Sequence, residues 1–110
     1  MPDPVEAAVE TAAETLPELD PMLHSKLRLA IVSLLVSVEQ AEFTWLRTKT
    51  GATDGNLGAQ LLKLEEAGYV AVEKRFVARK PQSLYRLTPG GRQALTQYVQ
   101  SLRQLLGPAL

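Results

Sequence analysis

The chain has 110 residues and no cysteine, and its twelve basic side chains balance its twelve acidic ones. This length fits one domain with a real core, and the lack of cysteine excludes a disulfide framework, thiolate chemistry and a cysteine metal site. No run approaches the roughly 20 apolar residues of a membrane span, and the N-terminal MPDPVEAAVE lacks the basic start of a signal peptide. We therefore expect a cytoplasmic protein that does not contact a membrane.

The net charge of zero conceals two segments of opposite sign. Residues 1–20 contain six acids and no base, whereas residues 21–110 contain twelve bases and six acids, a net charge of +6. Nucleic-acid binding depends on local basic surface more than on the total charge.

Two helices are predicted before residue 40. An acidic helix over residues 1–19 begins at Asp3-Pro4, which has the pattern of an N-cap followed by a first helical residue. A second helix begins at either Asp20-Pro21 or Ser25, and its apolar residues on nearly all sides predict burial on two faces. The acidic helix carries one apolar stripe, formed by Val5, Val9, Ala12 and Leu16.

The next segment has the signals of two short helices separated by a tight turn. Gly51 closes the first as a C′ glycine, where a left-handed residue costs least. Thr53 then serves as the N-cap of a helix over residues 54–67, and Gly68 ends it. The apolar stripe of this second helix is formed by Leu57, Leu61 and Leu64.

Residues 69–88 have the pattern of two strands around a basic tip. Tyr69–Val77 alternates as a half-buried strand does, Pro81 is predicted to break the run, and Ser83–Leu87 alternates again. Thr88-Pro89 then resembles the N-cap and first residue of a last helix within residues 89–110. A basic loop alone can simply be solvated, but after a helix-turn-helix the favoured role is phosphate contact by Lys74, Arg75, Arg79 and Lys80.

This order of elements predicts a mainly α fold with a small β-wing, the winged helix-turn-helix, with its core at residues 20–88. Such a fold places one helix in a DNA groove. The predicted recognition residues lie away from the leucine stripe: Thr53, Asp54, Asn56, Ala59, Gln60 and Lys63. Asn and Gln suit adenine, and Lys suits guanine or phosphate. Arg47 and Lys49 are predicted to join the four wing bases as phosphate contacts, whereas Asp54 favours the helix dipole but repels phosphate.

The two terminal helices are predicted to form a dimer interface. The last helix has a stripe that a small winged domain does not need for its own core, and a second subunit can cover it; the alternative is that each terminal helix folds back on its own domain. The predicted interface residues are Val5, Val9, Leu16, Leu95, Val99, Leu102 and Leu106.

Four stretches carry a resemblance to a known family: HSKLRLAIVSLL, TDGNL, LLKLEEAGYV and RKPQSLYRLTPGGRQAL. The chain resembles MarR-type winged-helix transcriptional regulators over roughly residues 20–106, and is most similar to the small prokaryotic branch with one terminal dimerisation helix. The resemblance implies a homodimer on a partly palindromic operator. The chain departs from the family at Gly58 and Ala59, where relatives commonly carry serine and arginine. Gly58 suggests the close approach of another backbone, although sequence drift explains it equally well.

Two other functions remain open at this level. The neutral recognition helix would suit a winged-helix protein-interaction module, and a pocket between dimer helices would suit an effector-responsive regulator. Catalysis has little support, because His24 is the single histidine and no acids are spaced to converge. We expect no enzyme activity, no metal and no cofactor, with double-stranded DNA and a second copy of the chain as partners.

Overall fold

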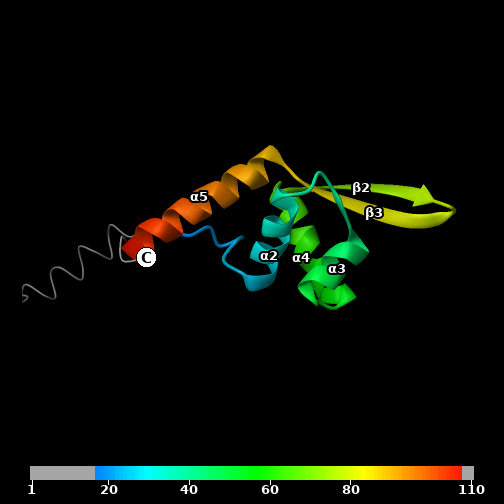
Figure 1. The fold of residues 1–110 in the computed structure, drawn as a ribbon, viewed down its shortest axis with the longest axis horizontal. Coiled ribbons are helices and arrows are strands. Elements are labelled where there is room, and N and C mark those ends of the chain that lie inside the picture. Colours follow the sequence, from blue (N-terminus) through cyan, green and yellow to red (C-terminus); the bar gives the residue numbers. More distant parts are fainter. Residues whose placement is uncertain (1–16, 108–110) are drawn as a thin grey trace, which may run out of the picture.

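The computed structural model describes residues 17–107 (Figure 1). Its elements in chain order are α2 (Lys26–Val36), β1 (Ala41–Glu42), α3 (Phe43–Thr50), α4 (Asp54–Glu66), β2 (Val70–Val77), β3 (Lys80–Leu87) and α5 (Pro89–Leu106). Most of the predicted acidic helix, with the proposed interface residues Val5, Val9 and Leu16, lies outside the described residues. Residues 17–19 are irregular.

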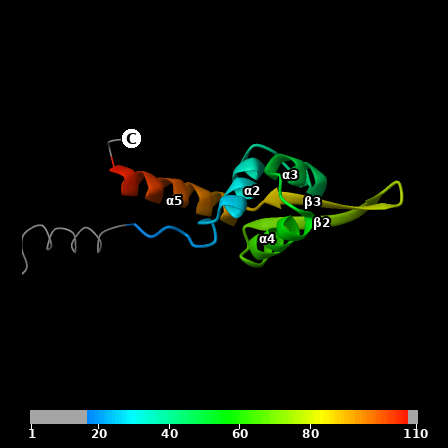
Figure 2. The same cartoon turned by 90° about the horizontal axis from the view of Figure 1, so that it is seen from below.

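The three central helices pack around one core beside a small antiparallel sheet with the strand order β1-β3-β2. Both views show the β2–β3 hairpin projecting beyond α2, α3 and α4, while α5 leaves in the opposite direction (Figures 1 and 2). This arrangement confirms the predicted winged helix-turn-helix. The largest fully buried side chains of the core are Leu23, Ile31, Val32, Leu35, Leu46, Leu57, Leu61 and Leu64.

Both predicted start signals before α2 are used. The Oδ1 atom of Asp20 accepts a hydrogen bond from the Met22 N–H at 2.9 Å, and the Asp20 carbonyl accepts from the N–H of His24 at 2.9 Å. This closes a separate turn. Ser25 then caps α2, its hydroxyl oxygen accepting from the Arg28 N–H at 3.3 Å. α2 contacts α3, α4, α5 and β3, which explains its apolar residues on nearly all sides.

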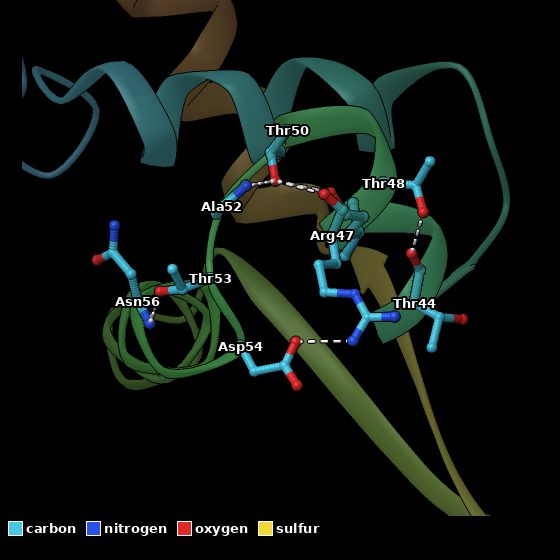
Figure 3. A network of polar contacts seen from close by, with 9 residues as sticks. Thr44, Arg47, Thr48, Thr50, Ala52, Thr53, Asp54 and Asn56 are labelled. Carbon is cyan, nitrogen blue, oxygen red and sulfur yellow. Dashed lines mark hydrogen bonds and ion pairs between the residues drawn. The ribbon is translucent and has the colours of Figure 1, made fainter.

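The predicted turn between α3 and α4 is confirmed in detail (Figure 3). Gly51 has φ +70° and its N–H donates to the Arg47 carbonyl at 2.9 Å. Thr53 caps α4, its Oγ1 accepting from the Asn56 N–H at 3.2 Å. Gly68, at φ +79°, follows the end of α4. Because only glycine adopts this left-handed region without strain, the two glycines set where both helices end.

The wing differs from the prediction at Pro81, which lies within β3 and does not break it. The strands are joined by a two-residue turn, Ala78-Arg79, with φ values of +49° and +65°. In such a hairpin the pair next to the turn is hydrogen-bonded, so the following pair, Phe76 with Pro81, is not. Pro81 therefore needs no N–H toward β2, and β1 pairs with β3 only opposite Leu84 and Tyr85. The two-residue β1 was not predicted, since it is too short to show alternation.

α5 begins against the sheet, and a glycine at its start allows the close approach. Thr88 caps the helix, accepting from the Gly91 N–H at 3.0 Å, and its hydroxyl donates to the Gly68 carbonyl at 2.6 Å. Gly91 is buried, and a Cβ atom there would lie 2.2 Å from the Tyr69 carbonyl oxygen. Further along α5, the Tyr98 hydroxyl lies 3.2 Å from His24 Nδ1. His24 thus has a hydrogen-bonding partner on the last helix.

One polar contact ties the turn before α2 to the end of α4. The Tyr69 hydroxyl donates a hydrogen bond to Asp20 Oδ2. This bond, together with burial and the negative charge of Asp20, raises the pKa of Tyr69 from 10.0 to about 12. The phenol therefore stays protonated, and keeps its hydrogen bond, at alkaline pH where a free tyrosine loses its proton.

Candidate nucleic-acid interface

The face of α4 away from the core carries most of the predicted recognition residues. Leu57, Leu61 and Leu64 are fully or almost fully buried, so the opposite side of the helix faces solvent. Of the predicted residues, those that are exposed are Thr53, Asp54, Asn56, Ala59 and Lys63.

Gln60 differs from the others because it is half-buried and held from two sides. Its Oε1 accepts a hydrogen bond from Arg28 Nη1 of α2 at 2.6 Å, and its Nε2 donates to Asn56 Oδ1 at 3.2 Å. Arg28 is fixed in turn, since its Nε donates to the Met22 carbonyl at 2.7 Å. Arg28 was not among the predicted residues, and its separation from Gln60 by 32 positions left no local signal.

This chain of hydrogen bonds limits how the two amides can read a base. A bidentate contact to adenine requires the amide oxygen to accept while the amide nitrogen donates. The oxygens of both Asn56 and Gln60 are already accepting within the protein. As arranged here, α4 presents the Asn56 amide nitrogen as a free donor, which suits acceptors such as purine N7 and guanine O6.

The two predicted phosphate contacts on α3 make contacts inside the protein. Arg47 Nη1 lies 2.8 Å from Asp54 Oδ1, with side-chain exposures of 44% and 67% (Figure 3). Such an exposed pair contributes only about 0–1 kcal/mol and is screened by salt, but it offsets the Asp54 charge at the start of α4. The Lys49 ammonium lies 5.7 Å from the centre of the Trp45 ring. Both cations remain exposed, and Arg47 lies beside the start of α4.

The two glycines within α4 face open space. A Cβ atom at Gly55 or Gly58 would meet no other atom within 4 Å in the described part of the chain. The close backbone approach suggested for Gly58 therefore does not come from residues 17–107. Gly58 instead lines a shallow groove of about 240 Å³ between α4 and the hairpin, together with Leu61, Leu62, Glu65, Val72, Lys74 and Tyr85.

All four predicted wing cations are exposed on the β2–β3 hairpin. Lys74 and Arg75 lie on β2, Arg79 lies in the turn, and Lys80 begins β3. The Arg75 Nε donates to Gln82 Oε1 on the opposite strand at 3.0 Å. The hairpin thus presents a concentration of positive charge beyond the helical core.

The predicted stripe on α5 divides into two parts. Leu95 and Leu102 are half-buried and pack against the domain's own core, whereas Val99 and Leu106 are 39% and 47% exposed, and Leu105 beside them is 40% exposed. A groove of about 290 Å³ runs along this helix, lined by Val36, Arg92, Leu95, Thr96, Val99, Gln100 and Arg103.

Residues 17–107 show neither a metal centre nor a membrane span. No three His, Asp or Glu side chains in this part gather to hold a metal ion. None of its helices is both long and apolar enough to cross a membrane.

Comparison with known proteins agrees with this geometry. Residues 27–106 match the model of a family described as winged helix DNA-binding domain. The chain is 36% identical over 84 residues to the uncharacterized protein MJ0432 of Methanocaldococcus jannaschii, covering 76% of this chain and 91% of the relative.

Two solved structures share the fold. A transcriptional regulator homologue from Pyrococcus horikoshii has a TM-score of 0.72 and 22% identity, with 91% of this chain and 94% of that chain covered. A structure described as a transcriptional regulator of the MarR family from Enterococcus faecalis has a TM-score of 0.61 and 24% identity, with 93% and 84% covered. Since the family model spans most of the chain, this protein belongs to the winged helix DNA-binding domain family.

Proposed function

We propose that this protein is a cytoplasmic transcriptional regulator that binds a partly palindromic DNA operator as a homodimer, without enzymatic activity. The observation that carries the proposal is the exposed face of α4 beside a hairpin with four exposed cations. A helix with a basic wing beside its exposed face can contact base edges and phosphates at the same time. Occupation of the operator would then block or recruit polymerase.

The available side chains indicate which element reads the bases and which residues bind the phosphates. α4 offers few groups to the bases, mainly Asn56 and Lys63, so phosphate contacts must supply most of the affinity. The wing residues Arg79 and Lys80 are the outermost of these cations. Arg47, which pairs with Asp54 at the start of α4, and Lys49 on α3 would add phosphate contacts.

The first test removes the outermost wing cations. We expect Arg79→Ala/Lys80→Ala to weaken binding to every duplex about equally, and to flatten the log–log salt dependence by about one unit for each phosphate that the protein no longer binds. The measurement is a gel shift with the DNA upstream of the protein's own gene, repeated across salt concentrations. Arg92→Ala/Arg103→Ala on α5 removes the same charge away from the wing; because both residues line the α5 groove beside the proposed dimer interface, it serves as the control only after light scattering shows the same oligomeric state as the wild type. An unchanged affinity and slope in the wing variant would contradict the proposal.

A second test concerns base reading. We expect Asn56→Ala to narrow the affinity gap between operator and random DNA by about 1 kcal/mol, the lower end of the range for a bidentate base contact, because Asn56 offers the base only its amide nitrogen. Affinity for random DNA should barely change, which makes it the internal control. Gln60→Ala should narrow the same affinity gap, because it removes the hydrogen bond that holds the Asn56 amide in one orientation. If neither variant changes the ratio of operator affinity to random-DNA affinity, Asn56 and Gln60 of α4 do not read bases.

A protein-interaction module is the second candidate. Leu62 on α4 is 53% exposed beside the shallow groove with Lys74 and Tyr85, and an exposed apolar side chain suits a protein surface. Loss of a protein complex on Leu62→Asp, with DNA binding unchanged, would favour this candidate.

The groove along α5 leaves room for an effector-responsive form of the regulator, in which a small molecule binds between dimer helices.

A further inference from the structure

Arg28, near the start of α2, differs from every other cation of this chain. All twelve lysine and arginine side chains lie within residues 17–107, and Arg28 is half-buried whereas the others are exposed. It forms no ion pair with the described residues. Its partners are neutral oxygens: the carbonyls of Met22 and Pro21, 2.7 Å from Nε and 3.5 Å from Nη2, and Gln60 Oε1, 2.6 Å from Nη1. Since burying a cation costs free energy, what these hydrogen bonds hold in place needs an explanation.

The turn that holds Arg28 is itself tied to its surroundings. Asp20 Oδ1 accepts a hydrogen bond from the Met22 N–H at 2.9 Å, and Asp20 Oδ2 accepts from the hydroxyl of Tyr69, just after α4. The Met22 carbonyl in turn accepts from Arg28. The guanidinium therefore has a fixed position relative to α4.

Arginine can only donate hydrogen bonds, and this sets the direction of the bonds that follow. Because the guanidinium has no acceptor, Gln60 must turn its amide oxygen toward Arg28. The Gln60 amide nitrogen is then left to donate to Asn56 Oδ1 at 3.2 Å, and the Asn56 nitrogen is left for a partner outside the protein. An amide rotated by half a turn fills the same space with its oxygen and nitrogen exchanged. Arg28 excludes the rotated form of both side chains.

The fixed orientation decides which base edge suits the exposed Asn56. Its amide nitrogen carries two hydrogens, and guanine presents two acceptors, N7 and O6, in the major groove. Adenine presents N7 beside its N6 amino group, which is a donor and faces a second donor. Cytosine presents only its N4 donor. Guanine is therefore favoured over adenine and cytosine.

We propose that Arg28 is a positioning residue that sets the base preference of α4: without touching DNA, it holds Gln60 and Asn56 in the orientation that selects guanine. The proposal rests on the proposed DNA-binding function and assigns its base preference to a residue of α2. Without the guanidinium both amides can rotate, so an amide oxygen can accept from adenine N6 while the nitrogen donates to N7. Loss of Arg28 therefore equalises the two purines and leaves binding itself in place.

The test selects bound duplexes from a library of random sequences of about 30 base pairs, enough for two half-sites, with the full-length wild type and its variants. The position that loses its preference in Asn56→Ala is the one that Asn56 reads. There we expect the wild type to favour guanine over adenine about 5-fold, equivalent to about 1 kcal/mol, and Arg28→Met to favour it less than about 2-fold. Arg28→Lys should keep most of the preference, because an ammonium group also only donates.

A second variant tests the same chain of bonds with Arg28 in place. In Gln60→Glu the carboxylate still accepts from Arg28 but can no longer donate to Asn56. Asn56 should then turn its nitrogen toward the carboxylate and its oxygen outward, so the preference should reverse toward adenine or cytosine. This variant decides the question if circular dichroism shows that Arg28→Met does not fold.

Arg47→Met is the matched control. It removes an equal charge beside α4, but Arg47 bonds to Asp54 and not to the two amides, so the base preference should stay. The salt slope of Arg28→Met should equal that of the wild type, because no phosphate contact is lost. A slope lowered by about one unit with the preference unchanged would mean that Arg28 binds phosphate instead.

Two results separate this inference from the proposed function. If the wild type binds duplexes but does not favour guanine at this position, or if a folded Arg28→Met keeps the preference, the inference is wrong and the proposed function stands. If the wild type binds no duplex of the library, both are wrong.

Discussion

Gly91→Ala should destabilise the fold by about 3 kcal/mol or more, the largest effect that we expect from a single methyl group in this chain. A Cβ atom at this position would lie 2.2 Å from the Tyr69 carbonyl oxygen and 2.7 Å from Leu87 Cδ1. The carbonyl cannot move freely, because it accepts a hydrogen bond from the Thr88 N–H at 3.1 Å. The clash of the added Cβ atom can therefore be relieved only if the start of α5 shifts away from the sheet.

The neighbouring glycine supplies the control for this experiment. A Cβ atom at Gly90 would lie 3.6 Å from the nearest atom, an ordinary contact, so Gly90→Ala should be neutral or stabilising by up to about 1 kcal/mol. Urea unfolding followed by circular dichroism measures both variants. Equal stability of the two would mean that α5 does not begin against Tyr69 and Leu87 as described.

The second large effect is expected at the exposed part of the α5 stripe. Val99→Asp/Leu106→Asp should give a folded monomer that binds operator DNA more than about 100-fold more weakly, because linked half-sites gain that much from avidity. If α5 pairs with its copy across a two-fold axis, the variant buries unpaired charges, each costing several kcal/mol. The pairing would set the two α4 helices about 34 Å apart.

Position 102 is less suited to this test. Leu102 packs against the domain's own core, so Leu102→Asp would disturb folding as well as assembly. Val99 and Leu106 avoid this because they are 39% and 47% exposed. Light scattering gives the oligomeric state, and Gln104→Asp, which places a charge at an exposed polar position of α5, is the control. A dimeric double variant, or a wild type that is monomeric at micromolar concentration, would contradict the proposed interface.

The sequence by itself determined where α3 ends, where α4 begins and ends, and where α5 begins. Gly51, Thr53, Gly68 and Thr88 act through their own backbone preferences or on N–H groups within a few residues. The leucine stripe of α4 could be read for the same reason, since helical periodicity is local. These signals were enough to predict the winged fold, the exposed side of α4 and the order of the elements other than the short β1.

Only the tertiary structure decided the features that depend on distant partners. Pro81 stays in β3 because its pairing with Phe76 needs no N–H, a consequence of the turn at Ala78-Arg79. The α5 stripe divides because Leu95 and Leu102 find the core of their own domain. Gln60 is held by Arg28, 32 positions away. Hydrogen bonds and packing between two segments far apart in the chain leave no periodic pattern in the sequence of either segment. Which groups of α4 stay free for a base is therefore decided only when the helices pack together.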